Sequence, residues 1–205
     1  MDINNLKSLL QNRKPRILGS ENYSNYAVLL PIIEKADGLH VLFEVRSHTL
    51  RRQPGEICFP GGRVDASDKN EGHTAIRETS EELGIAEEEI INVSPLDYMV
   101  SSFGSIIYPY LGFIKESARI SPNPDEVAEV FSVPLTYLQQ TKPEIFQINF
   151  KLEPEENFPF HHITGGEKYK WQVRQMEEYF YYYEDKVIWG LTARILSHFL
   201  EIINS

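Results

Sequence analysis

Residues 59–85 read FPGGRVDASDKNEGHTAIRETSEELGI: a glycine turn, a polar loop, and then a helix that is rich in carboxylates and ends at Gly84. Side chains three and four residues apart share a helix face, so Glu78, Glu81 and Glu82 should project together within one turn. Carboxylates this close repel one another at a modest cost if the face is solvated. Mg²⁺ or Mn²⁺ would reverse that cost, because both ions prefer oxygen ligands. The pattern therefore predicts either a wet acidic face or a site for a divalent ion.

The surroundings of this cluster favour the second interpretation. A second acidic run, Glu87 to Glu89, has no such surroundings and is typical of a solvated surface. The first cluster follows Phe-Pro-Gly-Gly, has Arg77 directly beside Glu78, and is closed by Gly-Ile. We expect Arg77 to play a structural part, by orienting a neighbouring carboxylate or by packing the loop.

The segment resembles the Nudix box, Gly-x5-Glu-x7-Arg-Glu-U-x-Glu-Glu-x-Gly-U, where U is a bulky apolar residue. Residues 77–85 fit its second half, with Thr79 at a U position. In the first half Lys69 stands where the pattern has Glu, although Asp68 could substitute if one residue is inserted before Arg77. The resemblance implies an α+β Nudix fold, an α/β/α sandwich around a mixed β-sheet with the box as a loop-helix-loop.

Arginines are concentrated just before the box. Residues 46–63, RSHTLRRQPGEICFPGGR, hold four Arg against the single acidic residue Glu56. Guanidinium groups bind phosphate bidentately, which suits an anionic ligand. The alternative is that these arginines pair with the excess acid of the protein itself.

The spacing of this segment resembles a motif of coenzyme A pyrophosphatases, Leu-Leu-Thr-x-Arg-Ser-x3-Arg-x3-Gly-x3-Phe-Pro-Gly-Gly. Arg46, Ser47, Arg51, Gly55 and residues 59–62 fall in register, whereas Phe43 and Glu44 depart from Leu-Thr. The segment Trp189-Gly190-Leu191-Thr192-Ala193 also resembles a segment near the end of such enzymes. The resemblance therefore extends over most of the chain.

This resemblance implies hydrolysis of the diphosphate bond of coenzyme A and its derivatives, giving adenosine 3′,5′-bisphosphate and 4′-phosphopantetheine products. Mg²⁺ or Mn²⁺ would be held by Glu78, Glu81 and Glu82, which are the expected metal ligands and catalytic residues. Glu126 is a further catalytic candidate, as ligand or base, with Glu129 next. The expected substrate contacts are Arg46, Arg51, Arg63 and the backbone of Gly61 and Gly62, which lack a Cβ and allow close approach.

Two other functions stay open on sequence grounds. A general hydrolase of nucleoside diphosphates such as ADP-ribose, NADH or dinucleoside polyphosphates is compatible with the departures at Phe43, Glu44 and Lys69. A non-catalytic binding or regulatory module is the other alternative. The intact glutamates of residues 77–82 speak against the module.

Length and composition set the outer limits. The 205 residues fit one domain, residues 1–205, with an N-terminal helix and linker at 1–20 and a closing helix at 188–203. A net charge of −10 argues against a nucleic-acid binder. No signal peptide or membrane-length apolar run is visible, so we expect a cytoplasmic protein without membrane contact that acts on a small nucleotide. A homodimer is a candidate assembly. The one cysteine, Cys58, is expected to be a small packed hydrophobe.

Hydrophobic patterning predicts a strand-rich chain. The expected strands are 26–33, 39–45, 90–99, 108–114, 125–131, 146–152 and 178–183. The strand 125–131 alternates acidic and apolar residues, with Glu126 on its exposed side. Tyr179 to Tyr183 are five aromatic residues in a row, whose one face is expected to be core. Their other face could be a lid or a stacking surface. The adjacent His161 and His162 are expected at the surface.

Overall fold

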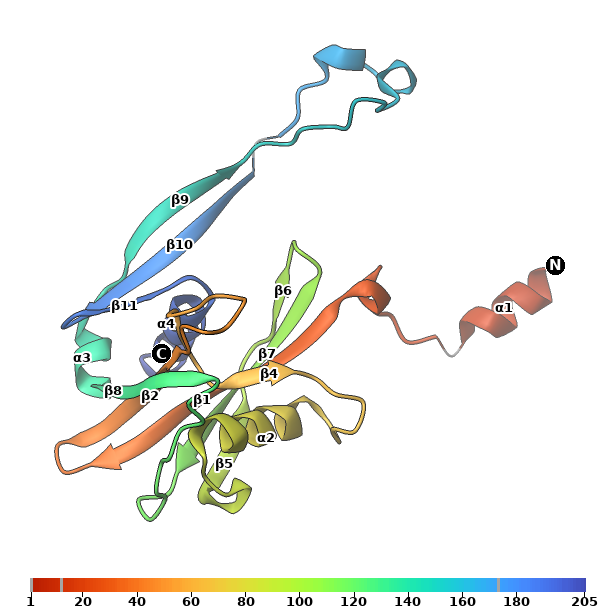
Figure 1. Cartoon of the computed structure of the whole chain (residues 1–205). Helices are drawn as coiled ribbons and strands as arrows, with labels where there is room; N and C mark the ends of the chain where they lie inside the picture. The colour runs from red at the N-terminus through yellow and green to blue at the C-terminus, as the bar shows by residue number, and fades with distance from the viewer. Residues whose placement is uncertain (1, 12, 173) are drawn as a thin grey trace.

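A mixed β-sheet between two helices forms the body of the protein in the computed structural model, which describes residues 2–11, 13–172 and 174–205 (Figure 1). Strand β1 runs parallel to β7 and antiparallel to β2 and β4. The order along the sheet is β3-β2-β1-β7-β5, with β8 paired to β2 and β6 to β7. The strands are β1 (Ser24–Lys35), β2 (Gly38–Arg46), β3 (Ile57–Cys58), β4 (Gly61–Arg63), β5 (Ile90–Pro95), β6 (Met99–Ser101), β7 (Ser105–Ile114) and β8 (Val127–Pro134).

Each face of the sheet is covered by one helix. Successive strand residues point to opposite faces, and β1 uses both. Ala27 and Leu29 pack in a cluster with Ala75 and Leu83 of helix α2 (Glu71–Leu83). Leu30 and Ile32 pack in a second cluster, whose helical members from α4 (Gly190–Ile203) are Ala193, Ile195, Leu196, Phe199 and Leu200. The predicted α/β/α arrangement is confirmed.

A second, three-stranded sheet extends from the body as an arm (Figure 1). It consists of β9 (Glu144–Phe150), β10 (Arg174–Tyr183) and β11 (Lys186–Trp189), and α3 (Leu135–Gln140) leads into it from β8. Of the aromatic run, Tyr181 is buried in the core cluster with α4, as predicted for one face. On the other face Phe180 stacks on Trp189, with ring centroids 5.9 Å apart.

The remaining elements lie at the surface. Helix α1 (Ile3–Gln11) stands apart from the body and buries none of its residues (Figure 1). The 3-10 turns are η1 (Ser20–Asn22), η2 (Glu87–Glu89), η3 (Phe160–His162) and η4 (Gly166–Lys168). His161 and His162 are exposed in η3, as expected. No helix among the described residues combines the length and the apolar character needed to cross a bilayer.

Several predicted boundaries were wrong. Helix α4 begins at Gly190, not at 188, because Ile188 and Trp189 pair with β10 as part of β11. The predicted strand 90–99 is two strands, β5 and β6, that pair with different parts of β7. Strand β8 begins at Val127, so Glu126 lies in the preceding turn and is half-buried, whereas alternation placed it on the exposed side of a strand. Strands β3 and β4 are too short to give a periodic signal.

Candidate active site

Helix α2 has clear start and stop signals. The side chain of Asn70 accepts a hydrogen bond from the N–H of His73 at 2.9 Å, which caps the helix. Gly84 ends it with φ of 62°, and a Cβ there would lie 2.0 Å from the carbonyl oxygen of Ser121. Thr79, which departs from the apolar residue of the box, is fully buried but donates its hydroxyl to the Ala75 carbonyl at 2.7 Å. A polar residue is tolerated there because its hydrogen bond is satisfied.

The glycine turn holds Glu82. The Gly61 N–H donates to Oε2 of Glu82 at 2.8 Å, and the Glu82 side chain is buried. Gly61 itself pairs with Val28 in the sheet, and a Cβ on it would lie 2.4 Å from the carbonyl oxygen of Ala27. The amide that sequence analysis assigned to a substrate phosphate is therefore occupied by a carboxylate in this structure. Gly61 acts here by fixing Glu82.

Gly62 makes room for Glu78. A Cβ on Gly62 would lie 2.3 Å from the carboxyl carbon of Glu78 and 2.4 Å from its Oε1. The half-buried Glu78 carboxylate is thus pressed directly against the backbone of β4. The second glycine is required by this close approach.

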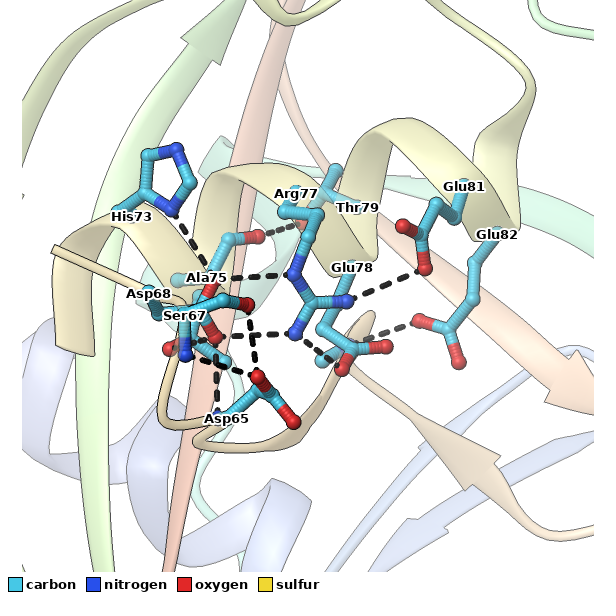
Figure 2. A network of polar contacts seen from close by, with 12 residues as sticks. Asp65, Ser67, Asp68, His73, Ala75, Arg77, Glu78, Thr79, Glu81 and Glu82 are labelled. Atoms are coloured by element: carbon cyan, nitrogen blue, oxygen red, sulfur yellow. Dashed lines mark hydrogen bonds and ion pairs between the residues drawn. The ribbon is translucent and has the colours of Figure 1, made fainter. Parts of the chain in front are cut away.

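Arg77 connects the box carboxylates to the loop before the helix. Its guanidinium donates to Oε1 of Glu78 at 2.8 Å and to Oε2 of Glu81 at 3.2 Å (Figure 2). The same group makes two bonds to Asp68, at 3.0 Å to Oδ1 and 3.1 Å to Oδ2. These contacts match the orienting role expected for Arg77.

Asp68 fills the gap in the first half of the box. Its side chain is only 1% exposed, and besides Arg77 it bonds Nδ1 of His73 at 3.0 Å and accepts from the hydroxyl of Thr74 at 2.8 Å. The Arg77 guanidinium, ahead of the other donors, holds the pKa of Asp68 well below its usual range. Asp68 is therefore the acidic partner of Arg77, although the uninterrupted spacing of the box pointed to position 69, where the chain has lysine. This is the substitution that a one-residue insertion before Arg77 would allow.

The carboxylates of α2 lie near two further glutamates, Glu44 of β2 and Glu126 in the turn before β8. Glu44 of β2 is buried, with Oε1 accepting a hydrogen bond from the Cys58 thiol at 3.3 Å. Burial, and then the nearby charge of Glu44, raises the pKa of Glu82. Burial also raises the pKa of Glu44 and of Glu78, and the charge of Glu126 contributes to both. Glu44, Glu78, Glu82 and Glu126 thus form one mutually repelling group, which we call the acidic pocket.

Glu129, the second candidate in this region, faces away from the acidic pocket. It pairs with Val45, whose neighbours Glu44 and Arg46 point to the other face of β2. Its carboxylate bonds Nζ of Lys186 at 2.7 Å. Glu126 is therefore the residue of this segment that the structure brings to the other carboxylates.

Cys58 lies beside Glu44 of the acidic pocket, in an environment that disfavours its thiolate form. Burial, and then the charge of Glu44, raises the pKa of its thiol far above the usual range. The thiol stays protonated and serves as a hydrogen-bond donor. The prediction of an inert cysteine is in agreement with this environment.

The donor set of the acidic pocket fits a hard divalent ion. It offers only carboxylate oxygens, and Oε2 of Glu44 is buried with no hydrogen-bond partner in the described part of the chain. Within residues 2–11, 13–172 and 174–205, no three side chains are arranged to hold one ion together as they stand. Mg²⁺ usually keeps several waters and takes one or two carboxylates from the protein, so Glu82 and Glu78 are enough to begin such a site.

The arginines before the box do not pair with the protein's own acid. Arg46 is half-buried at the end of β2, whereas Arg51, Arg52 and Arg63 are exposed. For the residues that the structure describes, none of these four has a carboxylate oxygen within 4.0 Å. Ser47 anchors their loop beside the acidic pocket, because its N–H donates to the Glu126 carbonyl at 2.7 Å. The loop therefore keeps its positive charge available for a ligand.

Without metal, this protein is expected to lose thermal stability as pH rises from about 5 to about 9. The carboxyls of Glu82, Glu44 and Glu78 have raised pKa values in the folded state, so they keep protons that the unfolded chain has already released. Their contribution is complete below the unfolded pKa and is lost as pH rises through the folded pKa. Melting curves in chelator across this range would check it, and Mg²⁺ should restore more stability at the alkaline end. A melting temperature that rises with pH would contradict the acidic pocket.

Comparison with known proteins identifies the class of enzyme. The NUDIX domain family matches residues 24–154. The chain therefore belongs to the Nudix family and is a Nudix hydrolase, the enzyme class predicted from the box. Enzymes of this family generally use divalent metal ions.

Two relatives narrow the comparison. The chain is 38% identical to the peroxisomal coenzyme A diphosphatase NUDT7 of Mus musculus over 138 residues, which are 63% of this chain and 58% of that protein. It is 34% identical to the uncharacterized Nudix hydrolase NudL of Photorhabdus laumondii over 177 residues, which are 86% of this chain and 83% of that protein. The resemblance to coenzyme A diphosphatases inferred from the arginine motif is confirmed.

A solved structure supports the fold. The crystal structure of a MutT/nudix family protein from Enterococcus faecalis matches with a TM-score of 0.51 at 18% identity, covering 100% of this chain and 71% of that one. Agreement at this identity concerns the fold alone.

Proposed function

We propose that this protein is a diphosphatase that uses Mg²⁺ or Mn²⁺ to cleave coenzyme A and its derivatives into adenosine 3′,5′-bisphosphate and 4′-phosphopantetheine products. The observation that carries the proposal is that a cluster of carboxylates lies next to a loop rich in arginine. The acidic pocket lies beside a loop whose four arginines have no carboxylate oxygen within 4.0 Å among the residues that the structure describes. A substrate with a diphosphate bond and a further phosphate group would use the carboxylates to bind a metal ion at the diphosphate and the arginines to bind the further phosphate.

Glu78, Glu81 and Glu82 are the proposed metal ligands. A bound divalent ion would neutralise diphosphate charge and make a coordinated water more acidic. Glu82 is fixed by Gly61, and Glu78 and Glu81 by Arg77, so the carboxylates are positioned before substrate arrives. Glu126, half-buried in the turn before β8, is the proposed further ligand or general base.

Arg46, Arg51 and Arg63 are the proposed contacts of the nucleotide phosphates. Arg46 lies next to the acidic pocket, because it is two residues from Glu44 at the end of β2 and its charge acts on that carboxyl, and its Nε is buried without a partner among the described residues. Arg51 and Arg63 are exposed and free to reach an anion such as the 3′-phosphate. Gly61 and Gly62 stay the proposed backbone contacts of the substrate, and they also support the site by fixing Glu82 and by admitting the Glu78 carboxylate.

Hydrolysis assays on a panel of diphosphates would test this proposal. Coenzyme A should be cleaved more efficiently than ADP-ribose, NADH or diadenosine polyphosphates. Dephospho-coenzyme A, which lacks the 3′-phosphate, should show a higher KM, and Arg51→Gln or Arg63→Gln should remove that difference. Arg16→Gln, an exposed arginine outside the matched domain, is the control. Equal or better cleavage of the other substrates would refute the preference for coenzyme A.

The two alternatives give different results in the same assays. A general nucleoside-diphosphate hydrolase would cleave several substrates at similar kcat/KM. A non-catalytic module would bind nucleotide without Mg²⁺-dependent turnover. The complete set of Glu78, Glu81 and Glu82, held by Arg77 and Gly61, favours a catalyst over a module.

Three further expectations stay proposals. We propose that residues 1–205 act as one catalytic domain, in which the arm and α1 are accessories to the part that matches the family. A homodimer through the arm is supported by its exposed apolar face, formed by Phe146, Ile148, Val187 and Trp189. Sedimentation of the wild type and of Phe146→Glu would test it. The cytoplasmic location is also a proposal, which imaging of the tagged chain would test.

A further inference from the structure

Glu44 is a buried carboxylate that the proposed metal ligands do not include. It follows Leu42 on the face of β2 that packs toward α2, and its side chain is 1% exposed. Oε1 has one partner, the thiol of Cys58 at 3.3 Å on the neighbouring strand β3. Oε2 has none in the part of the chain that the structure describes.

Such an oxygen needs a compensating partner. A buried carboxylate loses its hydration and recovers it only through hydrogen bonds or an opposite charge. A thiol is a weak donor and satisfies one of the two oxygens. An apolar residue of similar volume would pack at this position without that cost, so the contacts within the protein give no reason for a glutamate here.

The charges around Glu44 are mainly negative. Leu42, on the same face of β2, packs in one cluster with Leu83, the residue next to Glu82 on α2. Glu126 lies in the turn before β8, and its carbonyl accepts from the N–H of Ser47, just beyond the end of β2, at 2.7 Å. The one nearby cation is Arg46, two residues along the same strand, and its Nε is likewise buried without a partner among the described residues. A divalent cation between β2 and α2 would relieve this repulsion.

We propose that Glu44 is an additional carboxylate of the metal site, whose free Oε2 binds the divalent ion, or a water of that ion, from the sheet side while Glu82 binds from the helix side. The inference rests on the proposed function, because it assumes an ion at Glu82. It adds a ligand from β2 to a site otherwise built from α2. It also gives the departure of Glu44 from the Thr of the arginine motif a chemical role.

The alternative is a structural carboxyl. In that case Glu44 keeps a proton and only fills space beside Cys58. The two roles differ in what removal of the carboxylate does to metal affinity. Removal of the carboxylate could change the rate of the metal-bound enzyme to the same extent under either role, so the rate does not distinguish them.

Calorimetric titration of the full chain with Mn²⁺ would distinguish them. Glu44→Gln keeps the shape and the acceptor for the thiol, and it should raise the Kd for Mn²⁺ by about tenfold or more. The same variant should raise the melting temperature in chelator and reduce the gain in melting temperature that Mn²⁺ produces, since it removes a repelling charge that the ion would offset. Glu44→Thr, which is smaller, should show the same pattern if the glutamine variant folds poorly. Glu88→Gln, an exposed glutamate of η2, should match the wild type in both measurements.

The outcomes separate this inference from the function on which it rests. If Glu44→Gln and Glu44→Thr bind Mn²⁺ as tightly as the wild type while Glu82→Gln does not, Glu44 is structural and the metal site of α2 stands. If the wild type itself binds no Mn²⁺, both the inference and the proposed function fail. A lower affinity with an unchanged melting temperature in chelator would still support Glu44 as a ligand.

Discussion

Replacing Glu82 with glutamine should reduce diphosphate hydrolysis by about a thousandfold, which corresponds to about 4 kcal/mol of transition-state stabilisation. Glutamine preserves the size of the side chain and can still accept the hydrogen bond from the Gly61 N–H, so the fold of the turn should survive. What disappears is the negative charge that would bind the ion. The loss should therefore appear mainly in kcat and in the affinity for Mg²⁺.

The matched control for this change is Glu88→Gln. Glu88 is the same residue type, six positions further along and exposed in η2, so its replacement should leave activity unchanged. Circular dichroism and melting curves of both variants would show that the fold is intact. Turnover by Glu82→Gln at the rate of the wild type would mean that the ion, and therefore the chemistry, lies elsewhere.

Gly62→Ala should lower activity by about a hundredfold, because a displacement of about 1 Å at a catalytic group commonly has that effect. The added methyl group would lie 2.3 Å from the carboxyl carbon of Glu78, so the carboxylate must move. The backbone of Gly62 is not left-handed, so the contact with Glu78 is the main cost. Steady-state kinetics at several Mg²⁺ concentrations would show whether the loss follows metal binding.

Gly104→Ala is the glycine control for that experiment. Gly104 lies in the turn between β6 and β7, and a Cβ there would have no atom within 4 Å. Its φ of 78° makes alanine unfavourable for the backbone, so the control reports the stability cost of a strained turn without a clash at the site. Comparable activity losses in the two variants would show that Gly62 has no special relation to Glu78.

Much of the fold was predictable because its signals are local. The apolar runs of β1 and β2, the capped and amphipathic α2, and the helical spacing of α4 each depend on residues within one element. The motifs then placed these elements in a known family. The lengths of short strands were not predictable, since β3 and β4 exist only through pairing with β2 and β1.

The candidate site shows the same limit. Glu78, Glu81 and Glu82 share one helix face by spacing alone, so predicting them as metal ligands needed no knowledge of the fold. The contact between Gly61 and Glu82 and the approach of Gly62 to Glu78 connect positions far apart in sequence, so their geometry required the fold. Asp68 could be predicted only as a possible substitute for the first glutamate of the box, because a one-residue insertion shifts the spacing to Arg77. Glu44 carried one signal, its departure from the arginine motif, and the burial that gives it meaning comes from the packing of β2 against α2.

The environment of Cys58 has a consequence for the proposed substrate. Coenzyme A ends in a thiol, and its oxidised form is a disulfide, which a protein thiolate would attack to form a mixed disulfide. The only cysteine of this chain donates its proton to Glu44 and has a strongly raised pKa, so it offers almost no thiolate for that exchange. If the oxidised form of coenzyme A is among the substrates, the enzyme would therefore not be trapped as a mixed disulfide with it.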